Sequence, residues 1–151
     1  MSSEEQQSSE RRVCRLHRLV ADVSLVAGAK VLLVRYKDTT KYDHQSGWFL
    51  PDDFLSHLER PADAARRILQ EQVGHAIPTV TIAQIESFER HGWWHLIFHY
   101  AAALENPPEL EPGPNVRSAE WFALEALPDR SEVAHDGWAL DILNQARGII
   151  A

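Results

Sequence analysis

Acidic side chains gather in one stretch of the sequence, residues 47–74, which reads GWFLPDDFLSHLERPADAARRILQEQVG. Asp52 and Asp53 follow an aromatic and apolar run, and Glu59 lies in the acidic loop that comes next. Glu71 lies in the helical pattern that closes the stretch. Carboxylate oxygens are hard ligands of the kind that Mg²⁺ takes in proteins. The stretch therefore has the composition of a catalytic site, and the question is whether all of the chemistry is present.

Each of these charged residues also has a purely structural interpretation. Arg67 and Glu71 lie four residues apart, and such pairs are common on helices that have no site. Asp52 and Asp53 could form an Asx-type turn after the proline. Glu59, alone in a loop, could simply be solvated. The residue types by themselves leave both interpretations open.

The eight histidines do not form a chelating pattern. His95 and His99 share one face of an expected strand but lie about 13 Å apart at strand rise, too far to hold one zinc ion directly. His57, His75 and His91 could each contact a phosphate or act as a base, although an ordinary surface role is more frequent. The opposite face of the same strand is aromatic and is the expected core face: Trp94, Leu96, Phe98 and Tyr100.

The first elements that position these residues are strands. Two β-rich runs, residues 20–26 and 30–36, are joined by Ala, Gly and Ala and predict a hairpin. Residues 37–46 are polar and rich in turn formers, which predicts a loop. Residues 48–50 predict a short strand that ends at Pro51.

Two helices complete the pattern. Residues 61–73 predict a helix with proline at the first position and Gly74 as the stop. Two further strands follow, with a break near residues 90–92, and residues 118–127 predict a strand that turns into a helix start. An amphipathic helix over roughly 132–147 ends the pattern. This order predicts the α+β class, an α/β/α sandwich in which helices cover a mixed β-sheet.

Length and charge limit the domain count and the partners. A chain of 151 residues with 44% hydrophobic and 25% charged residues fits one domain, which we expect over residues 13–151. The formal net charge of −7 argues against a general nucleic-acid or anionic-membrane surface. Nucleic acid and membrane are therefore not expected as partners.

The beginning of the sequence is polar. Residues 1–12 predict a frayed tail, or a short helix capped by Ser2 and Glu5. The one cysteine, Cys14, allows no intrachain disulfide and lies near several arginines that could activate the thiol slightly. No apolar run approaches the ~18–20 residues that span a bilayer. These features favour the cytoplasm.

The stretch resembles the Nudix box. Glu59, Arg67, Leu69, Glu71 and Gly74 stand at the spacing of that family's signature, and the preceding GWFLP resembles its usual lead-in. AKVLLVRY before the box and AEWFALEALP near the end resemble the family's flanking strands. The agreement of box, lead-in and flanks identifies the chain as a Nudix-like protein, which implies a mixed sheet with a box helix and a C-terminal helix.

Several box positions depart from the family. Asp52 and Asp53 stand where the family has glycines, and His75 replaces the closing aliphatic residue. In the family, three glutamates of the helix bind divalent cations that polarise a diphosphate and position water. Here Ile68 and Gln72 replace two of the three, while Glu71 is retained. Positions 68, 71 and 72 lie on one helix face, so this face has lost two negative charges.

The resemblance assigns roles to the residues that match. Glu59, Arg67 and Glu71 are the expected catalytic group, and Glu71 with Asp53 is the expected metal site. Asp53 is included in the expected metal site because a carboxylate at that loop position could replace a lost helix ligand. The expected cofactor is Mg²⁺ or Mn²⁺, weakly held if it is bound.

Two functions compete on this evidence. The first is a Nudix-fold module that binds a nucleotide or nucleoside-diphosphate-type ligand with weak or absent turnover, in a cleft walled by Trp48 and Trp93. The second is a metal-dependent hydrolase of a nucleoside diphosphate linked to another moiety. A third, weaker hypothesis is an interaction protein in which Ile68 is part of an apolar surface. A homodimer through an exposed edge is also expected as a partner state.

Overall fold

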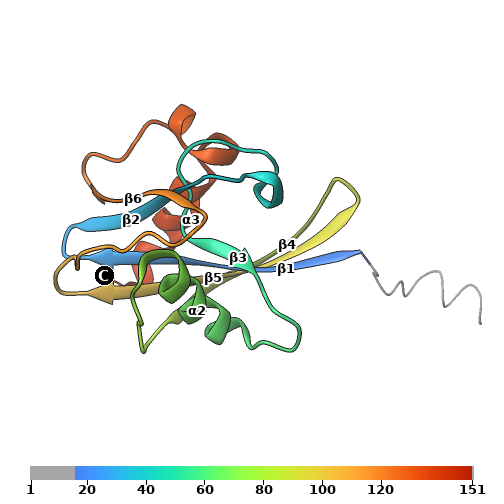
Figure 1. Cartoon of the computed structure of the whole chain (residues 1–151), viewed down its shortest axis with the longest axis horizontal. Helices are drawn as coiled ribbons and strands as arrows, with labels where there is room; N and C mark the ends of the chain where they lie inside the picture. Colours follow the sequence, from blue (N-terminus) through green and yellow to red (C-terminus); the bar gives the residue numbers. More distant parts are fainter. Residues whose placement is uncertain (1–15, 151) are drawn as a thin grey trace, which may run out of the picture.

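A computed structural model of the chain describes residues 16–150. Its main element is a six-stranded sheet, flanked by two α-helices and two short 3₁₀ helices (Figure 1). The strands are β1 (His17–Ala27), β2 (Lys30–Tyr36), β3 (Asp52–Phe54), β4 (Thr81–Arg90), β5 (Trp93–Leu104) and β6 (Val116–Ala123). The helices are η1 (Thr40–Tyr42), α2 (Pro61–Val73), η2 (Arg130–Glu132) and α3 (Ala134–Ile150). The expected polar tail or short helix over 1–12, and Cys14, lie outside the described residues.

The sheet is mixed and has the order β4-β5-β1-β2-β6. β1 runs parallel to β5 along its whole length, and the other pairings are antiparallel. β2 pairs with β1 only at Val26 and Ala27, while β3 pairs with residues 20–22 of the same strand. Because β2 and β3 pair with different parts of β1, β2 diverges from β1 away from Val26 and Ala27. The segment between β2 and β3 lies beside the place where these two strands separate.

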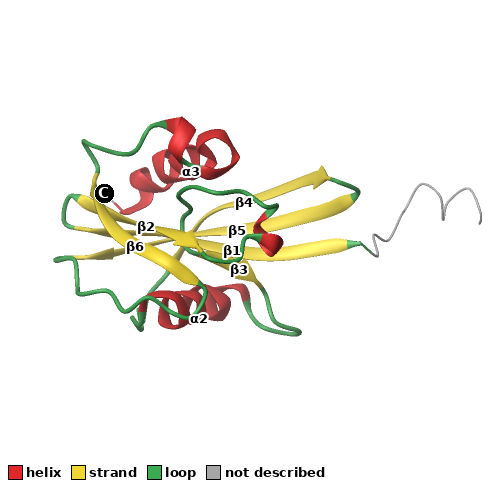
Figure 2. Ribbon diagram, turned by 45° about the horizontal axis from the view of Figure 1, so that its top comes forward, coloured by secondary structure: helices red, strands yellow, loops and turns green. Residues whose placement is uncertain are grey.

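Helices cover both faces of the sheet, α2 on one side and α3 on the other (Figure 2). Ala65, Leu69 and Val73 of α2 pack into one apolar core with residues of β1 and β2. Ile142 and Leu143 of α3 pack into a second core on the opposite face. The predicted α/β/α sandwich with a mixed sheet is therefore confirmed.

The aromatic face of β5 is only partly core, contrary to the sequence expectation. Tyr100 and Phe98 pack in the core beneath α2, but Trp94 is 40% exposed. On the other face His95 and His99 are buried. The reason is length: the β4–β5 hairpin extends past the end of α2 (Figure 1), so helix cover is lost towards the hairpin tip. Both faces of β5 are covered only in the middle of the sheet.

Pro51 precedes a strand rather than ending one. Trp48 and Phe49 form isolated bridges only, and the strand proper begins at Asp52. The Asx-type turn considered for Asp52 and Asp53 is therefore wrong, since both residues pair with β1 in extended conformation. Because alternate side chains of a strand point to opposite faces, Asp52 and Asp53 are directed to different sides of the sheet.

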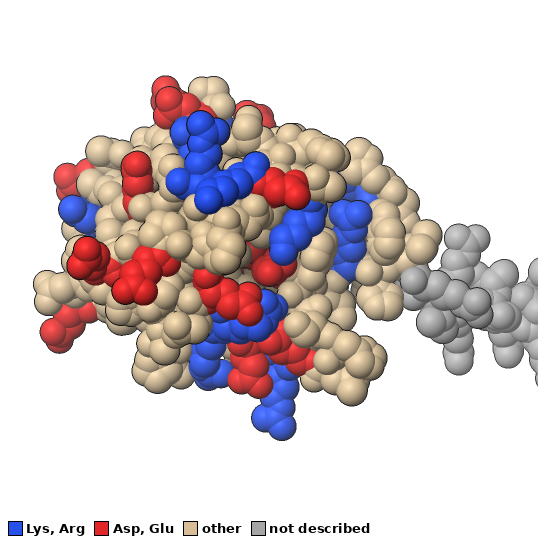
Figure 3. All heavy atoms as spheres, viewed as in Figure 1, with Lys and Arg blue, Asp and Glu red and all other residues tan. Residues whose placement is uncertain are grey.

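The face of the molecule shown in Figure 3 carries mixed charge. Over the face shown in Figure 3, Lys and Arg side chains lie beside Asp and Glu side chains rather than gathering into one patch. Among residues 16–150, no helix has the length and hydropathy that a membrane-spanning helix needs.

Candidate functional site

The box helix α2 forms where the sequence predicts it. Pro61 occupies the first turn, where its missing N–H costs no hydrogen bond. Gly74 ends the helix with a φ of 74°, a left-handed conformation that glycine adopts without steric cost. Its N–H donates to the carbonyls of Gln70 and Leu69. The helix therefore presents residues 67–72 at fixed positions beside β3.

Arg67 is the centre of an ion-pair cluster that fixes the loop before the helix. Its guanidinium donates to Glu59 at 2.9 Å, to Glu71 at 3.0 Å and to the carbonyl of Phe54 at 2.9 Å. The hydrogen bond from Arg67 holds the pKa of Glu59 below its usual range, so Glu59 is ionised near neutral pH. The structure thus brings together the three residues expected to be catalytic, but their charges are directed at one another.

The face of α2 that carries the metal ligands in the family is occupied differently here. Ile68 is only 1% exposed and packs against Ala21 and Ala64. Gln72 is 8% exposed. Glu71 alone carries a charge, and Arg67 neutralises it. This face is therefore closed by apolar packing at one position and by an amide at another.

The amide of Gln72 is fully engaged with β2 and β3. Its Oε1 accepts from the Tyr36 hydroxyl at 2.8 Å, and its Nε2 donates to the Asp52 carbonyl at 2.8 Å. The Tyr42 hydroxyl donates to the same carbonyl at 3.1 Å. The Asp52 backbone oxygen, which at this place in the family approaches the metal, therefore accepts N–H and O–H donors instead.

Asp53 is paired with cations of the chain itself. Lys41 Nζ lies 2.7 Å from Asp53 Oδ1, and a guanidinium nitrogen of Arg67 lies 3.7 Å from Oδ2. Asp52 is buried on the opposite face. Burial, together with the nearby charges of Asp22 and Asp53, raises the pKa of Asp52 well above its usual range. Asp53 is therefore paired with cations, whereas burial favours Asp52 as the neutral acid.

The residues present do not fit a divalent metal. Mg²⁺ and Mn²⁺ need several free carboxylate oxygens converging on one point, whereas Glu71 and Asp53 already face Arg67 and Lys41. Among the described residues, no three His, Cys, Asp or Glu side chains are placed to hold a metal ion. No step that needs a metal can be derived from this geometry.

A cleft lies beside this face, and it is named the main cleft here because it contains most of the ionisable side chains near β3. It encloses about 550 Å³, its open mouth included, and five rings contribute to its walls: Tyr42, Phe49, Phe54, Phe88 and Trp138. A second hollow contains Glu71 and Gln72. Lys41, Tyr42 and Asp53 line both hollows, so the Lys41–Asp53 ion pair separates the face of the box helix from the main cleft.

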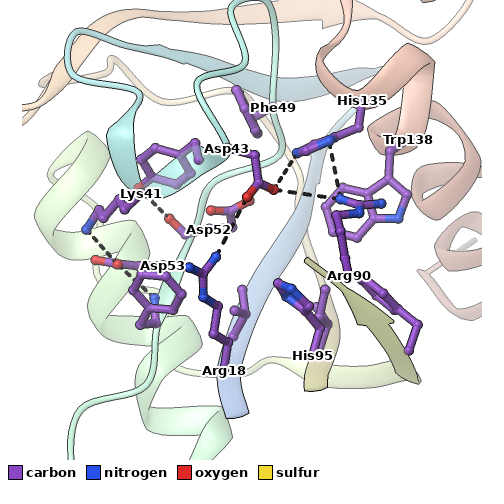
Figure 4. A pocket seen from close by; sticks show the side chains of 15 residues that line it. Arg18, Lys41, Asp43, Phe49, Asp52, Asp53, Arg90, His95, His135 and Trp138 are labelled. Atoms are coloured by element: carbon purple, nitrogen blue, oxygen red, sulfur yellow. Dashed lines mark hydrogen bonds and ion pairs between the residues drawn. The ribbon is translucent and has the colours of Figure 1, made fainter. Parts of the chain in front are cut away.

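Sequence reasoning did not assign five of the ionisable residues of this cleft to a site. Arg18, Asp43, Arg90, His95 and His135 line it (Figure 4). They come from β1, from the loop after η1, from the end of β4, from β5 and from the start of α3. No local spacing connects them, because only the tertiary fold, of sheet, loop and α3 together, brings them close.

The two tryptophans expected to wall a ligand lie elsewhere. Trp48 is 6% exposed and packs edge-on against Phe122, with the guanidinium of Arg35 over its ring. Trp93 lies beneath the guanidinium of Arg18, at 4.7 Å from the ring centroid. Trp48 is thus a core residue and does not line the cleft, and Trp93 contacts the cleft only through Arg18.

His99 forms a buried pair of hydrogen bonds behind the cleft. Its Nδ1 lies 2.7 Å from Asp22 and its Nε2 lies 2.6 Å from Glu86. Although burial by itself lowers the pKa of His99, the hydrogen bonds and charges of Asp22 and Glu86 raise it more. The histidine is therefore favoured as a cation between two carboxylates, and the ring of Trp138 packs against it.

The comparisons with known proteins agree with this fold. The sequence profile of the NUDIX domain matches residues 16–141, and the chain belongs to this family. No curated protein matches the sequence.

Solved structures show the same fold at low identity. A MutT NUDIX hydrolase from Burkholderia pseudomallei is 22% identical, with 85% of this chain and 96% of that chain covered and a TM-score of 0.69. The NUDIX domain of NrtR from Shewanella oneidensis, complexed with ADP ribose, is 19% identical, with both chains fully covered and a TM-score of 0.71.

A third structure contains a metal ion. It is a bifunctional NMN adenylyltransferase/ADP ribose pyrophosphatase from Francisella tularensis, complexed with AMP and a Mn ion. It is 14% identical, with 98% of this chain and 46% of that chain covered and a TM-score of 0.70.

The burial of Ile68 gives a first prediction. Ile68→Glu, which returns the family's residue, places a carboxylate in an apolar contact and lowers the free energy of unfolding by about 3 kcal/mol or more. Chemical denaturation with and without Mg²⁺ measures it. The control Ile68→Leu keeps the volume and costs less than about 1.5 kcal/mol. If Ile68→Glu were as stable as Ile68→Leu and were stabilised further by Mg²⁺, the result would contradict the conclusion that apolar packing closes this face of α2.

The His99 pair gives a second prediction, on pH. Since the folded pKa of His99 is raised above the unfolded value of about 6.5, its stabilisation is complete below that pH and is lost as pH rises through the folded pKa. The difference in free energy of unfolding between wild type and His99→Asn should therefore shrink as pH rises. His91→Asn, in the β4–β5 turn at a positive φ that asparagine tolerates, serves as the control. A difference that is flat or grows with pH would refute the charged pair.

Proposed function

We propose that this protein binds a small molecule of nucleotide or nucleoside-diphosphate type in the cleft beside α2, and turns it over weakly or not at all. The observation that carries the proposal is the state of the box helix. Ile68 is buried, both ends of the Gln72 amide are hydrogen-bonded, and Glu71 faces Arg67. Without free carboxylates on this face, Mg²⁺ or Mn²⁺ is held weakly if at all, and the charge stabilisation that a metal gives to a diphosphate is missing.

The cleft supports binding on its own. Half-buried aromatic rings such as Phe54 and Trp138 offer apolar surface against which a base can pack, and Arg18 and Arg90 supply positive charge for phosphate oxygens. The solved NUDIX domain from Shewanella oneidensis is complexed with ADP ribose, and the Francisella tularensis enzyme with AMP. These ligands join a flat ring system to phosphate, the chemistry that this cleft suits.

The third prediction tests binding against hydrolysis. Calorimetric titration with ADP ribose and with AMP should give dissociation constants that agree within about twofold in EDTA and in excess Mg²⁺. Cleavage of the diphosphate of ADP ribose, which would give AMP and ribose 5-phosphate, should be weak or absent in both conditions, because the residues that hold a metal in the family are replaced.

Glu71→Gln is the matched variant for that experiment. It removes the one retained carboxylate of the helix and should leave binding unchanged, since Glu71 lies on the second hollow and not in the main cleft. Metal-dependent formation of AMP and ribose 5-phosphate from ADP ribose by the wild type that disappears in Glu71→Gln would overturn the proposal and favour a hydrolase, for which Asp53 is the candidate second metal ligand and Glu59 the candidate supporting residue.

We further propose one domain over residues 13–151, placed in the cytoplasm, with a homodimer as a partner state. The dimer is supported by β4, an edge strand of the described sheet. Ile85 is 54% exposed there, and its cross-strand neighbour Phe98 lies on the same face as Trp94. An exposed edge with apolar side chains is a surface on which a second strand can pair.

The fourth prediction follows from that edge. Light scattering after size exclusion should give a dimer for the wild type and a monomer for Ile85→Lys, because a charge on the strand face opposes pairing. Glu89→Lys, on the same face of the same strand but without an apolar side chain to lose, is the comparison. A monomeric wild type would rule out the dimer.

A further inference from the structure

Asp43 occupies the positively charged part of the cleft. Its Oδ1 lies 3.7 Å from Arg18, and its Oδ2 lies 3.7 Å from Arg90 and 3.4 Å from Nε2 of His135. In Figure 4 the carboxylate lies between these three side chains, which reach it from three different elements. A negative group of the chain itself therefore occupies the place where the cleft attracts anions.

The carboxylate fits this place loosely. Charge-assisted hydrogen bonds between nitrogen and oxygen are about 2.7–2.9 Å long, and all three distances exceed that range. A carboxylate offers two oxygens in one plane, whereas Arg18, Arg90 and His135 surround it from several directions. A tetrahedral phosphate group has three outward oxygens and a larger radius, so it can reach all three donors at once.

Aromatic rings hold the two guanidinium groups in position. Arg18 lies over Trp93 at 4.7 Å and near Phe54 at 5.9 Å from the ring centroids, and Arg90 lies over Phe88 at 5.2 Å. Stacking leaves the edge donors of a guanidinium available to other groups, and Nη1 of Arg90 lies 3.3 Å from Nδ1 of His135. The guanidinium groups of the two arginines are therefore held in position before a ligand binds, which lowers the entropy cost of binding.

The backbone that carries these groups is unusual on both sides of the contact. Asp43 and His44 have φ values of 56°, and His135 and Asp136 have values of 53° and 52°. Left-handed conformations are infrequent for residues other than glycine and cluster at functional sites. The main-chain N–H of His135 also donates to the side chain of Gln45 at 3.1 Å, so the two unusual segments are joined directly.

We infer that Arg18, Arg90 and His135 form a subsite for a phosphate or diphosphate group, and that Asp43 is an internal counter-anion which the ligand displaces. This deepens the proposed function and rests on it for the identity of the ligand. The subsite lies in the main cleft rather than in the hollow that contains Glu71. The ligand's charge is thus met by side chains of β1, β4 and the start of α3, without a metal ion.

The ionisation of His135 offers a way to test this assignment. Burial, followed by the charge of Arg90, lowers the pKa of His135, while Asp43 opposes this and His95 adds to it. Replacement of one carboxylate by a phosphate brings more negative charge to the imidazole and raises its pKa. The imidazole signals of His135 are therefore a direct reporter of anion binding.

The fifth prediction uses inorganic pyrophosphate as the probe, followed by NMR of the folded full chain. Pyrophosphate should shift the His135 imidazole and the Arg90 side-chain signals of the wild type. Asp43→Asn should bind it about three- to tenfold more tightly, because the binding-competent state no longer competes with the internal carboxylate. Asparagine also tolerates the left-handed backbone at this position. Arg90→Gln should bind it more weakly than the wild type.

Asp63→Asn is the matched control, since it removes the same charge from an exposed ion pair on α2. If Asp43→Asn binds pyrophosphate no more tightly than Asp63→Asn, or if pyrophosphate leaves the His135 signals of the wild type unmoved, the inference is overturned. The proposed function can fail separately. If pyrophosphate binds here but ADP ribose and AMP do not, the phosphate subsite stands and the proposal of a nucleotide ligand is wrong.

Discussion

The buried amide of Gln72 is the interaction on which the rest of the site depends. It joins α2 to the Tyr36 hydroxyl of β2 and to the backbone of Asp52 in β3, with both contacts at 2.8 Å. Because a buried amide must be hydrogen-bonded, these three elements are held in one arrangement. Tyr42 joins the same carbonyl and so ties the segment that carries Lys41 and Asp43 to the helix.

That arrangement balances the acidic side chains with cations of the chain. Arg67 pairs with Glu59 and Glu71, and Lys41 pairs with Asp53. In the family, by contrast, bound metal ions neutralise the carboxylates of the box helix. The loss of two helix carboxylates and the presence of Lys41 act in the same direction, since each reduces the attraction for a divalent ion. The positive charge of Arg18 and Arg90, which among the described residues only Asp43 opposes, at 3.7 Å, can then face a ligand.

The sequence predicts the parts of the fold that depend on local signals. The helix over 61–73 with its stop at Gly74 agrees residue for residue, because Pro, the apolar spacing and Gly act within a few residues. The first turn of α3 does not follow from such signals. His135 and Asp136 adopt left-handed conformations although neither is glycine, and contacts from distant segments, such as the bond from His135 to Gln45, set this geometry.

The site could be predicted only where the family signature covers it. Glu59, Arg67 and Glu71 meet as their spacing indicates. Arg18, Arg90 and His135 carry no signature, since three separate elements contribute them and only the strand order and the packing of α3 on the sheet make them neighbours. The prediction that Trp48 walls the cleft is wrong for a related reason. An aromatic residue before the box is apolar enough for either a cleft wall or a core, and only the position of α3 decides between these two places.

The central claim is that the cations of the chain replace the metal ions of the family at this site. Paramagnetic broadening by Mn²⁺ tests it most directly, because the effect reports the position of the ion on individual amide signals of the folded chain. With ADP ribose bound, we predict no selective loss of the signals of Asp52, Glu71 and Gln72 on addition of Mn²⁺. Selective broadening of those signals, reversed by EDTA, would place a metal on the box helix and contradict the account.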